Sequence, residues 1–302
     1  IVFEHFSYCP MLFRFLLILL LALSVPGFAT TVRDSIPPGK NFDKAQFELW
    51  YPNELKSVTG VIVLMPGSNE DGRPWANDPF WQALATRQHL ALVGCYFTDA
   101  PHPEMNIEYY ADVKQGSGQA LLDVLSRFAK HTGLAELATA PLLFWGHSAG
   151  GEFNYEFACW KPERVMAFVV NKGGFYYTAL APEATRNVPG LFLIGENDME
   201  SRNDIIKGLF MMNRRVGALW AFGSAPGAQH EIGTTQRLAG NFFSEVLTLK
   251  SSGKWPGPGF IGDFKAKTIT PAPAYKGNQF TCSWLATNLF ANAWLMFING
   301  IL

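Results

Sequence analysis

Short apolar segments alternate with longer segments of helical periodicity along most of the chain, and this alternation restricts the fold more than any other feature of the sequence. The runs 61–65 and 191–194 are apolar at every position, which is typical of strands buried on both faces of a sheet. Seven such runs predict strands at residues 47–51, 61–65, 90–96, 141–145, 165–170, 191–194 and 218–222. Apolar residues at helical spacing predict helices at residues 119–130, 150–160, 204–216 and 234–249.

The alternation predicts a doubly wound α/β fold with a mostly parallel central sheet flanked by helices. In such folds ligands bind beyond the carboxyl ends of the strands, so functional residues are expected there. We expect residues 30–302 to form a single domain. Within it, residues 251–276, rich in Gly, Pro and Lys, should be a surface excursion, and residues 283–302 a terminal helix packed on the domain. The alternative for this last segment is a membrane anchor, which three asparagines inside it disfavour.

The composition excludes several classes of protein. Hydrophobic residues make up 48% of the 302 residues and charged residues 16%, against about 25% charged in an ordinary soluble domain, which excludes a disordered or fibrous chain. The 24 Lys and Arg residues against 25 Asp and Glu residues give a formal net charge of −1. Because there is no excess of positive charge to hold a polyanion, we expect neither nucleic acid nor an anionic lipid surface as a partner.

The N-terminal segment has the pattern of a secretory signal. Arg14 precedes an apolar run at 15–23 that is too short to span a bilayer, and a Pro-Gly pair ends the helical pattern soon afterwards. We expect residues 1–29 to comprise upstream sequence and a signal peptide from Met11 to Ala29, with cleavage after Ala29. A secreted or periplasmic protein, without stable membrane insertion after cleavage, follows from this interpretation. The alternative is an uncleaved N-terminal anchor or a buried helix.

The cysteines do not form a framework. Cys9 precedes the predicted signal, which leaves Cys95, Cys159 and Cys282 in the mature chain. Three cysteines can form at most one bridge, and two of these lie in apolar segments, so we expect small buried thiols rather than a disulfide. No cysteines or histidines are paired at zinc spacing, and we expect neither a metal nor an organic cofactor.

The sequence Gly146-His147-Ser148-Ala149-Gly150 follows a predicted strand and precedes a predicted helix. A G-x-S-x-G pattern in this context is typical of a nucleophile elbow, a tight turn that pushes the serine hydroxyl above the sheet. The glycines are needed because larger side chains would clash in such a turn. The N–H groups at the start of the following helix can stabilise negative charge on a reacting oxygen. We therefore predict that Ser148 is a nucleophile.

With this motif in place, the chain resembles the α/β-hydrolase superfamily from about residue 47 to residue 249. The elbow, followed by Gly151, Phe153 and Trp-Lys-Pro-Glu-Arg-Val at 160–165, is similar to secreted bacterial esterases of the dienelactone hydrolase, feruloyl esterase and polyhydroxybutyrate depolymerase-like group. The resemblance implies an α/β-hydrolase fold and a serine hydrolase that cleaves carboxylic esters through an acyl-enzyme. No large cap domain is expected, because the stretch where caps enter runs only from 171 to 189.

The resemblance also implies a catalytic triad in the order serine, acid, histidine. Asp198 follows the sixth predicted strand, and His230, the only histidine downstream of Ser148, follows the seventh. In this triad His230 would take the proton of the serine hydroxyl and later protonate the leaving alcohol, while Asp198 would orient the imidazole. Glu196 and Glu200 are the competing candidates for the acid.

An oxyanion formed in this reaction needs two backbone N–H donors. The resemblance implies Ala149 as the first. The second should come from the loop after strand 61–65, where Pro66 replaces the histidine that many family members carry. We expect Ser68 rather than Gly67 to supply it.

The substrate is less constrained than the reaction. We expect an open cleft for a small-molecule or polymer-linked ester, with an aromatic rim that could hold an aromatic or sugar-linked group, formed by Trp75, Trp81, Phe175, Tyr176 and Tyr177. Ordinary packing is the alternative for each of these side chains. Two other functions stay open: a peptidase with the same triad, and a catalytically inactive secreted binding protein of the same fold.

Overall fold

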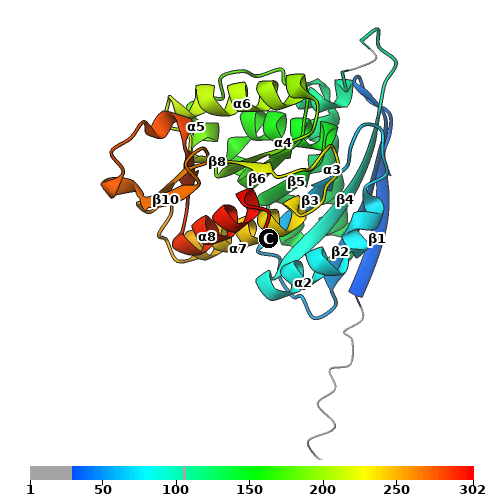
Figure 1. Ribbon diagram of the computed structural model, residues 1–302. Helices are drawn as coiled ribbons and strands as arrows, with labels where there is room; N and C mark the ends of the chain where they lie inside the picture. The colour runs from blue at the N-terminus through cyan, green and yellow to red at the C-terminus, as the bar shows by residue number, and fades with distance from the viewer. Residues whose placement is uncertain (1–28, 105–106) are drawn as a thin grey trace, which may run out of the picture.

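The computed structural model describes residues 29–104 and 107–302. Eight strands form the central sheet, namely β1 (Ala29–Ile36), β2 (Phe42–Pro52), β3 (Gly60–Met65), β4 (Leu90–Asp99), β5 (Leu142–Gly146), β6 (Val165–Asn171), β7 (Gly190–Gly195) and β8 (Trp220–Ala225). They lie in the order β1-β2-β4-β3-β5-β6-β7-β8 (Figure 1). The two pairs that involve β2 are antiparallel, and all pairs from β4 to β8 are parallel. The predicted mostly parallel α/β sheet is therefore confirmed.

Helices cover both faces of this sheet. They are α2 (Pro79–Gln88), α3 (Ser117–Thr132), α4 (Ala149–Trp160), the short α5 (Glu183–Arg186), α6 (Glu200–Arg214), α7 (Thr235–Ser251) and α8 (Asn288–Ile298). Helices α3, α4 and α6 pack on one face, and α2, α7 and α8 pack on the other (Figure 1). Short 3₁₀ turns lie at Arg73–Asn77, Tyr109–Ala111, Val113–Gln115, Ala135–Ala138, Pro162–Arg164, Ala272–Ala274 and Gln279–Thr281.

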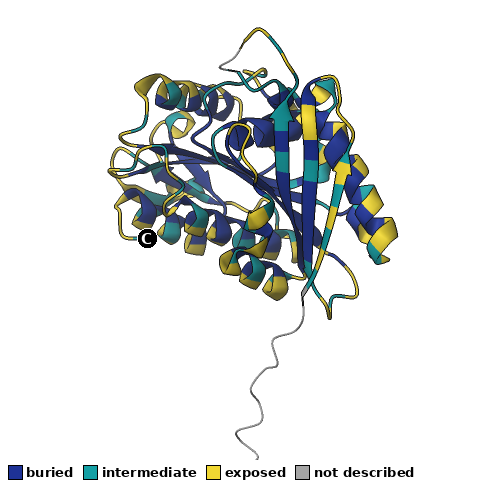
Figure 2. Ribbon diagram, turned by 90° about the vertical axis from the view of Figure 1, so that its right-hand side faces the viewer, coloured by how far each residue is buried: buried dark blue, intermediate teal, exposed yellow. Residues whose placement is uncertain are grey.

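The apolar runs are continuous because the central strands are covered on both sides. In β3, Val61, Val63 and Met65 pack against one helical layer, and Ile62 and Leu64 pack against the other. Figure 2 shows the buried strands between helices whose outer surfaces are exposed. A strand with water on one face would instead alternate apolar and polar residues.

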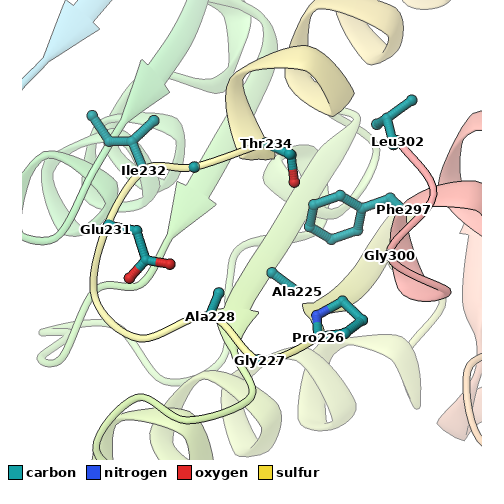
Figure 3. Close-up of a pocket in the computed structure, with 11 residues that line it drawn as sticks. Ala225, Pro226, Gly227, Ala228, Glu231, Ile232, Thr234, Phe297, Gly300 and Leu302 are labelled. Atoms are coloured by element: carbon teal, nitrogen blue, oxygen red, sulfur yellow. The ribbon is translucent and has the colours of Figure 1, made fainter.

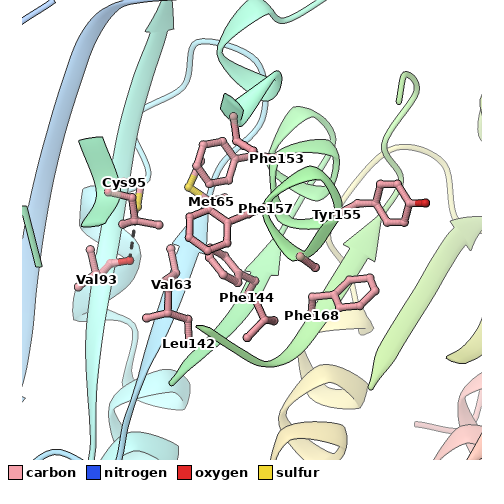
Figure 4. Close-up of a cluster of buried hydrophobic side chains, with 14 of the residues drawn as sticks. Val63, Met65, Val93, Cys95, Leu142, Phe144, Phe153, Tyr155, Phe157 and Phe168 are labelled. Atoms are coloured by element: carbon pink, nitrogen blue, oxygen red, sulfur yellow. Dashed lines mark hydrogen bonds between the residues drawn. The ribbon is translucent and has the colours of Figure 1, made fainter. Parts of the chain in front are cut away.

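Helix α4 is almost completely buried: every residue from Ala149 to Cys159 is buried. Figure 4 shows Phe153 and Phe157 of this helix beside Phe144 of β5. The rings of Phe144 and Phe157 lie 4.8 Å apart between centroids. Burying an aromatic side chain contributes roughly 1.5–3 kcal/mol, so this packing fixes the position of the helix that follows the G-x-S-x-G motif.

The predicted elements correspond to observed ones with small shifts. All seven predicted strands overlap β2 to β8, and the four predicted helices overlap α3, α4, α6 and α7. The strand expected at 218–222 begins two residues later, and the helix expected at 204–216 begins at Glu200. β1 was not predicted, because its residues do not alternate between polar and apolar types; in the structure exposed and partly buried residues alternate along it, as expected of an edge strand with one exposed face.

The C-terminal part differs from the expectation. The excursion at 251–276 carries two strands, β9 (Phe260–Asp263) and β10 (Thr268–Pro271), and residues 283–285, expected to be helical, form β11 (Ser283–Leu285). The three strands make a small antiparallel sheet in the order β10-β9-β11. β11 pairs along its whole length with β9, and the hydroxyl of Ser283 also bonds to both backbone groups of Phe222 in β8. The terminal helix begins only at Asn288, where the Thr287 side chain caps it.

The predicted signal segment lies outside the described residues apart from Ala29, the first residue of β1. β1 pairs with β2 along its whole length, from Ala29 opposite Pro52 to Ile36 opposite Ala45. Within residues 29–104 and 107–302, no helix is long and apolar enough to cross a membrane.

The three cysteines of the predicted mature chain are buried free thiols. Burial raises the pKa of the Cys159 thiol to about 12. They therefore behave as the small buried side chains that the sequence predicts.

Candidate active site

Ser148 occupies the turn between the end of β5 and the start of α4. Its backbone has φ 54° and ψ −125°, a strained conformation for a residue with a side chain. The turn is tight: a Cβ on Gly146 would lie 2.4 Å from the carbonyl oxygen of Gly150, and one on Gly150 would lie 2.2 Å from that of Met65. The N–H of Ser148 donates to the carbonyl of Asn171 at the end of β6. Both glycines are thus required by the geometry that the motif predicts.

The structure brings Ser148, His230 and Asp198 into one hydrogen-bonded chain. His230 Nε2 lies 3.0 Å from Ser148 Oγ, and His230 Nδ1 lies 2.8 Å from Asp198 Oδ2. The other oxygen, Asp198 Oδ1, accepts hydrogen bonds from the Met199 N–H and from Arg202 Nη1. The three residues come from the ends of β5, β7 and β8, which meet at the carboxyl edge of the sheet.

Asp198 is held in its ionised form by its neighbours. Burial alone raises the pKa of this carboxyl, but the hydrogen bonds from His230 and the Met199 N–H, together with the charge of Arg202, outweigh burial and leave the pKa below its usual value. The carboxylate of Glu196, the competing candidate for the acid, instead accepts a hydrogen bond from the Gly227 N–H at 2.7 Å.

Two side chains that the sequence analysis did not assign hold the loop that carries His230. Lys172 Nζ donates to the carbonyl oxygens of Gln229 and Glu231, and His147 Nε2 bonds to the carbonyl oxygen of His230 between them. Three consecutive carbonyls are thus bound by residues that directly follow β6 and β5. Because a carbonyl only accepts, His147 must carry its proton on Nε2.

Burial and nearby charges determine the protonation of His147 and Lys172. Burial lowers the pKa of His147 to about 4, so its imidazole is neutral at pH 7. Burial likewise lowers the pKa of Lys172, and the nearby Glu231 and Asp198 oppose that shift. Lys172 has φ 59°, a left-handed backbone conformation that a side chain disfavours. The buried lysine is therefore held in a strained position from which it reaches the loop.

The far side of the same loop is hollow. Figure 3 shows Ala228, Glu231 and Ile232 of the loop on one side of a cavity of 340 Å³, and Phe297 and Leu302 of the C-terminal segment on the other. Close packing therefore supports the loop incompletely on that side. The hydrogen bonds from Lys172 and His147 attach the half of the loop next to His230, and residues 196 and 197 after β7 bond to Gly227 and Ala228 at its start.

One expected oxyanion donor, Ala149, directly follows Ser148 in the chain, and the other, Ser68, lines the same cleft. Ala149 is the first residue of α4. The cleft that Ser68 and Ser148 both line has a volume of 580 Å³. The Gly67 N–H is already bonded to the Glu70 carboxylate at 3.2 Å. Among the described residues, the N–H groups of Ser68 and Ala149 make no hydrogen bond. The N–H of Ser68, rather than that of Gly67, is therefore available to a ligand in the cleft.

The aromatic rim was predicted only in part. Phe175 lines the cleft that contains Ser148. Trp75 and Trp81 do not form a rim: their rings lie 5.1 and 5.4 Å from that of Trp145, between α2 and the sheet. The expectation for these two tryptophans was wrong, because both indoles pack in the apolar layer on the face of the sheet covered by α2, α7 and α8. Tyr176 packs against Tyr155 rather than into the cleft.

Buried carboxyls of α4 hold the cleft wall on the side of Phe175. Glu152 Oε1 accepts hydrogen bonds from the N–H groups of Gly174 and Phe175, at 2.6 and 3.0 Å. One turn further along α4, Glu156 accepts from the N–H and the hydroxyl of Thr178. Two acidic residues four apart in an otherwise apolar helical segment were the available signal for these contacts, and Lys172 directly after an apolar strand was the signal for the other anchor.

Within the part of the chain that the structure describes, no group of three or more His, Cys, Asp or Glu side chains could hold a metal ion.

Solved structures with similar folds are esterases and related hydrolases. A ferulic acid esterase superposes with a TM-score of 0.53 at 14% identity, covering 73% of this chain and 98% of that one. A bacterial heroin esterase gives 0.50 at 16% identity over 80% and 90% of the two chains. An S-formylglutathione hydrolase from Staphylococcus aureus gives 0.50 at 12% identity over 74% and 99%. No family model and no curated protein matches the sequence.

The strand order, the elbow and these likenesses establish that the chain has the α/β-hydrolase fold. Several of the solved structures that share this fold with the chain are esterases. At identities of 12 to 16% these likenesses establish the fold, and activity has to be argued from the site itself.

Proposed function

We propose that this protein is a serine hydrolase that cleaves carboxylic esters through an acyl-enzyme on Ser148. The single observation that carries the proposal is the hydrogen-bonded chain from Asp198 through His230 to Ser148 Oγ, with distances of 2.8 and 3.0 Å. A serine hydroxyl is a weak nucleophile unless a base takes its proton, and here the imidazole lies within reach of it.

In the first half of the reaction, Ser148 Oγ attacks the ester carbonyl and its proton passes to His230 Nε2. The N–H groups of Ala149 and Ser68 stabilise the oxyanion that forms. His230 then gives the proton to the leaving alcohol, which leaves the acyl group on Ser148. Asp198, ionised and bonded to Nδ1, stabilises the imidazolium during both transfers.

In the second half, a water molecule replaces the alcohol. His230 takes a proton from this water, whose oxygen attacks the acyl carbon, and returns the proton to Ser148 Oγ as the acid is released. No group outside the site is needed to balance the proton transfers. The substrate class is a small-molecule or polymer-linked carboxylic ester.

Active-site labelling with a fluorophosphonate tests the proposal. The wild-type protein should be labelled and the Ser148→Ala variant should not. Turnover of p-nitrophenyl esters and methyl ferulate should fall by about six orders of magnitude in this variant, as in other triads whose members act as a unit. A well-folded wild-type protein that is neither labelled nor active would favour a binding protein, and cleavage of peptide anilides in place of esters would favour a peptidase.

We also propose that the mature chain is a single domain beginning at Thr30 and is secreted or periplasmic. Support comes from the signal pattern and from the position of Ala29 as the first residue of β1, which lets a cut after it leave that strand nearly whole. Mass spectrometry of protein recovered from a secreting host should find Thr30 at the N-terminus, and a chain starting at Met11 would contradict this.

A further inference from the structure

An apolar groove of 390 Å³ runs along α6 beside the cleft that contains Ser148. One of its walls is the segment 174–179, which follows β6, and the other is α6 itself. The side chains that form its surface are almost all apolar and include Phe175, Tyr176, Ala179, Ile205, Leu209 and Met212.

The groove and the cleft adjoin each other. Gly174, Phe175 and Ile205 line both of them. A molecule whose reacting group lies at Ser148 can therefore extend into the groove without leaving the protein surface. The cleft itself is more polar, since Glu108 and Arg202 contribute to its lining. The combined site thus has a polar end at the hydroxyl and an apolar end at α6.

The face of α6 that lines the groove is regular. Ile205, Gly208, Leu209 and Met212 are spaced by three or four residues and so form one stripe of the helix. In the free protein Ile205 and Met212 are 45% and 44% exposed. Gly208 in the middle of the stripe leaves open space, because a Cβ there would meet no atom within 4 Å. A small side chain at this position therefore leaves the groove open, whereas a large one would occupy it.

The opposite wall is fixed rather than loose. The carboxyl of Glu152 binds the N–H groups at Gly174 and Phe175, and that of Glu156 binds Thr178, so the segment is held at both ends from α4. A wall fixed in the free protein gives a preformed groove, which lowers the entropic cost of ordering a ligand.

We propose that this groove binds the extended hydrocarbon arm of an ester substrate whose carbonyl lies at Ser148. The inference rests on the proposed function and names the substrate class of that same site, an ester with a long apolar chain. Each methylene buried in the groove raises kcat/KM by up to about fourfold until the groove is filled. The chain belongs to either the acyl or the alcohol part, and the two are separated by experiment.

The test measures kcat/KM for p-nitrophenyl acetate and p-nitrophenyl decanoate, and for ethyl and decyl acetate. In the wild-type protein, one of the two series should favour its long member. Gly208→Phe fills the groove, and we expect it to lower kcat/KM for the long ester by about tenfold or more while the acetate with the short chain stays within about twofold. Gly208→Ala is the matched control and should retain the preference, because a methyl group leaves the groove open.

A second pair of variants covers the case in which the phenylalanine disturbs folding. Met212→Glu places a charge in the groove and should also remove the preference for the long ester. Met296→Glu makes the same change at an equally exposed methionine of α8, 42% exposed and outside the groove, and should not. Fluorophosphonate labelling of each variant separates the two proposals. If the proteins are labelled but show no chain-length preference, the groove proposal is overturned and the proposed function stands. The same holds if Gly208→Phe and Met212→Glu both leave the preference intact. A wild-type protein that is not labelled overturns both proposals.

Discussion

Lys172 Nζ donates a hydrogen bond of 2.6 Å to the carbonyl oxygen of Gln229, which joins the end of β6 to the loop that carries His230. Since the far side of that loop faces a cavity, this contact and its two neighbours hold the backbone on both sides of His230, from which the imidazole extends. We regard Lys172 as a positioning residue, because it acts on the reacting atoms through the loop.

Replacing Lys172 by Met removes the donors and keeps the length of the side chain. We expect kcat to fall by about 10- to 100-fold with KM nearly unchanged, because displacement of a catalytic base by about 1 Å has an effect of this size. Steady-state kinetics on esters measures both parameters. Lys130→Met, at an exposed lysine near the end of α3, is the control and should leave them as they are. A Lys172→Met enzyme with full kcat would show that the loop holds its place without the anchor.

The identity of the acid can be decided by two amide variants. Asp198→Asn should lower kcat/KM by about 10³- to 10⁴-fold, because the asparagine cannot stabilise the imidazolium and favours the wrong tautomer. Glu196→Gln should stay within a few-fold, since its carboxylate bonds the Gly227 N–H instead. If the two effects were exchanged, the acid would have been assigned to the wrong residue.

Glu152→Gln should change how stability depends on pH. Burial, reinforced by the charge of Glu108, raises the pKa of the Glu152 carboxyl to about 8, although the Gly174 and Phe175 N–H groups and Arg202 act in the opposite direction. The folded protein therefore keeps this proton at pH values where the unfolded chain has lost it. Stability from this group is complete below about pH 4.5 and is lost as pH rises towards 8, a change on the order of 5 kcal/mol.

The glutamine keeps an oxygen for the two N–H donors and cannot ionise. Urea unfolding at pH 5, 7 and 9 should show the free energy of unfolding of the variant falling less with pH than that of the wild-type protein. Asp123→Asn, at an exposed carboxyl of α3, serves as control. Parallel curves for wild type and Glu152→Gln would mean that Glu152 is already ionised in the folded protein.

The elbow can be probed by adding one methyl group. Gly150→Ala would place a Cβ 2.2 Å from the carbonyl oxygen of Met65, so we expect a loss of roughly 1–3 kcal/mol or more in the free energy of unfolding, together with loss of fluorophosphonate labelling. Gly208→Ala makes the same change where space is open and should stabilise α6 slightly. Equal stability of the two variants would mean that the turn is less constrained than its distances indicate.

Much of the fold could be predicted because its signals are local. Fully apolar runs such as 61–65 are typical of buried strands, and the G-x-S-x-G pattern predicts the tight turn in which the structure finds Ser148 at positive φ. β11 could not be predicted, because its partners are distant in the chain: Ser283 lies opposite Gly262 of β9 and bonds to Phe222 of β8, 61 residues earlier. Local periodicity contains no information about such a partner.

The same division applies to the site. The order of serine, acid and histidine along the chain is a sequence property, and it led to the three side chains that the structure brings together. The residues that support these three side chains could not be recognised in the sequence. Lys172 and Glu152 bind backbone groups, and a backbone N–H or carbonyl has no residue type by which it could be recognised in a sequence.

The contact between Ser283 and Phe222 also has a consequence for solubility. β8 is the last strand of the large sheet, and an open edge strand offers its N–H and carbonyl groups as a template for another chain. Here the hydroxyl of Ser283 and the indole N–H of Trp294 occupy the backbone groups of Phe222. The C-terminal segment thereby protects the sheet from edge-to-edge aggregation, so a chain shortened before residue 283 should form insoluble assemblies even though every residue of the proposed catalytic machinery remains.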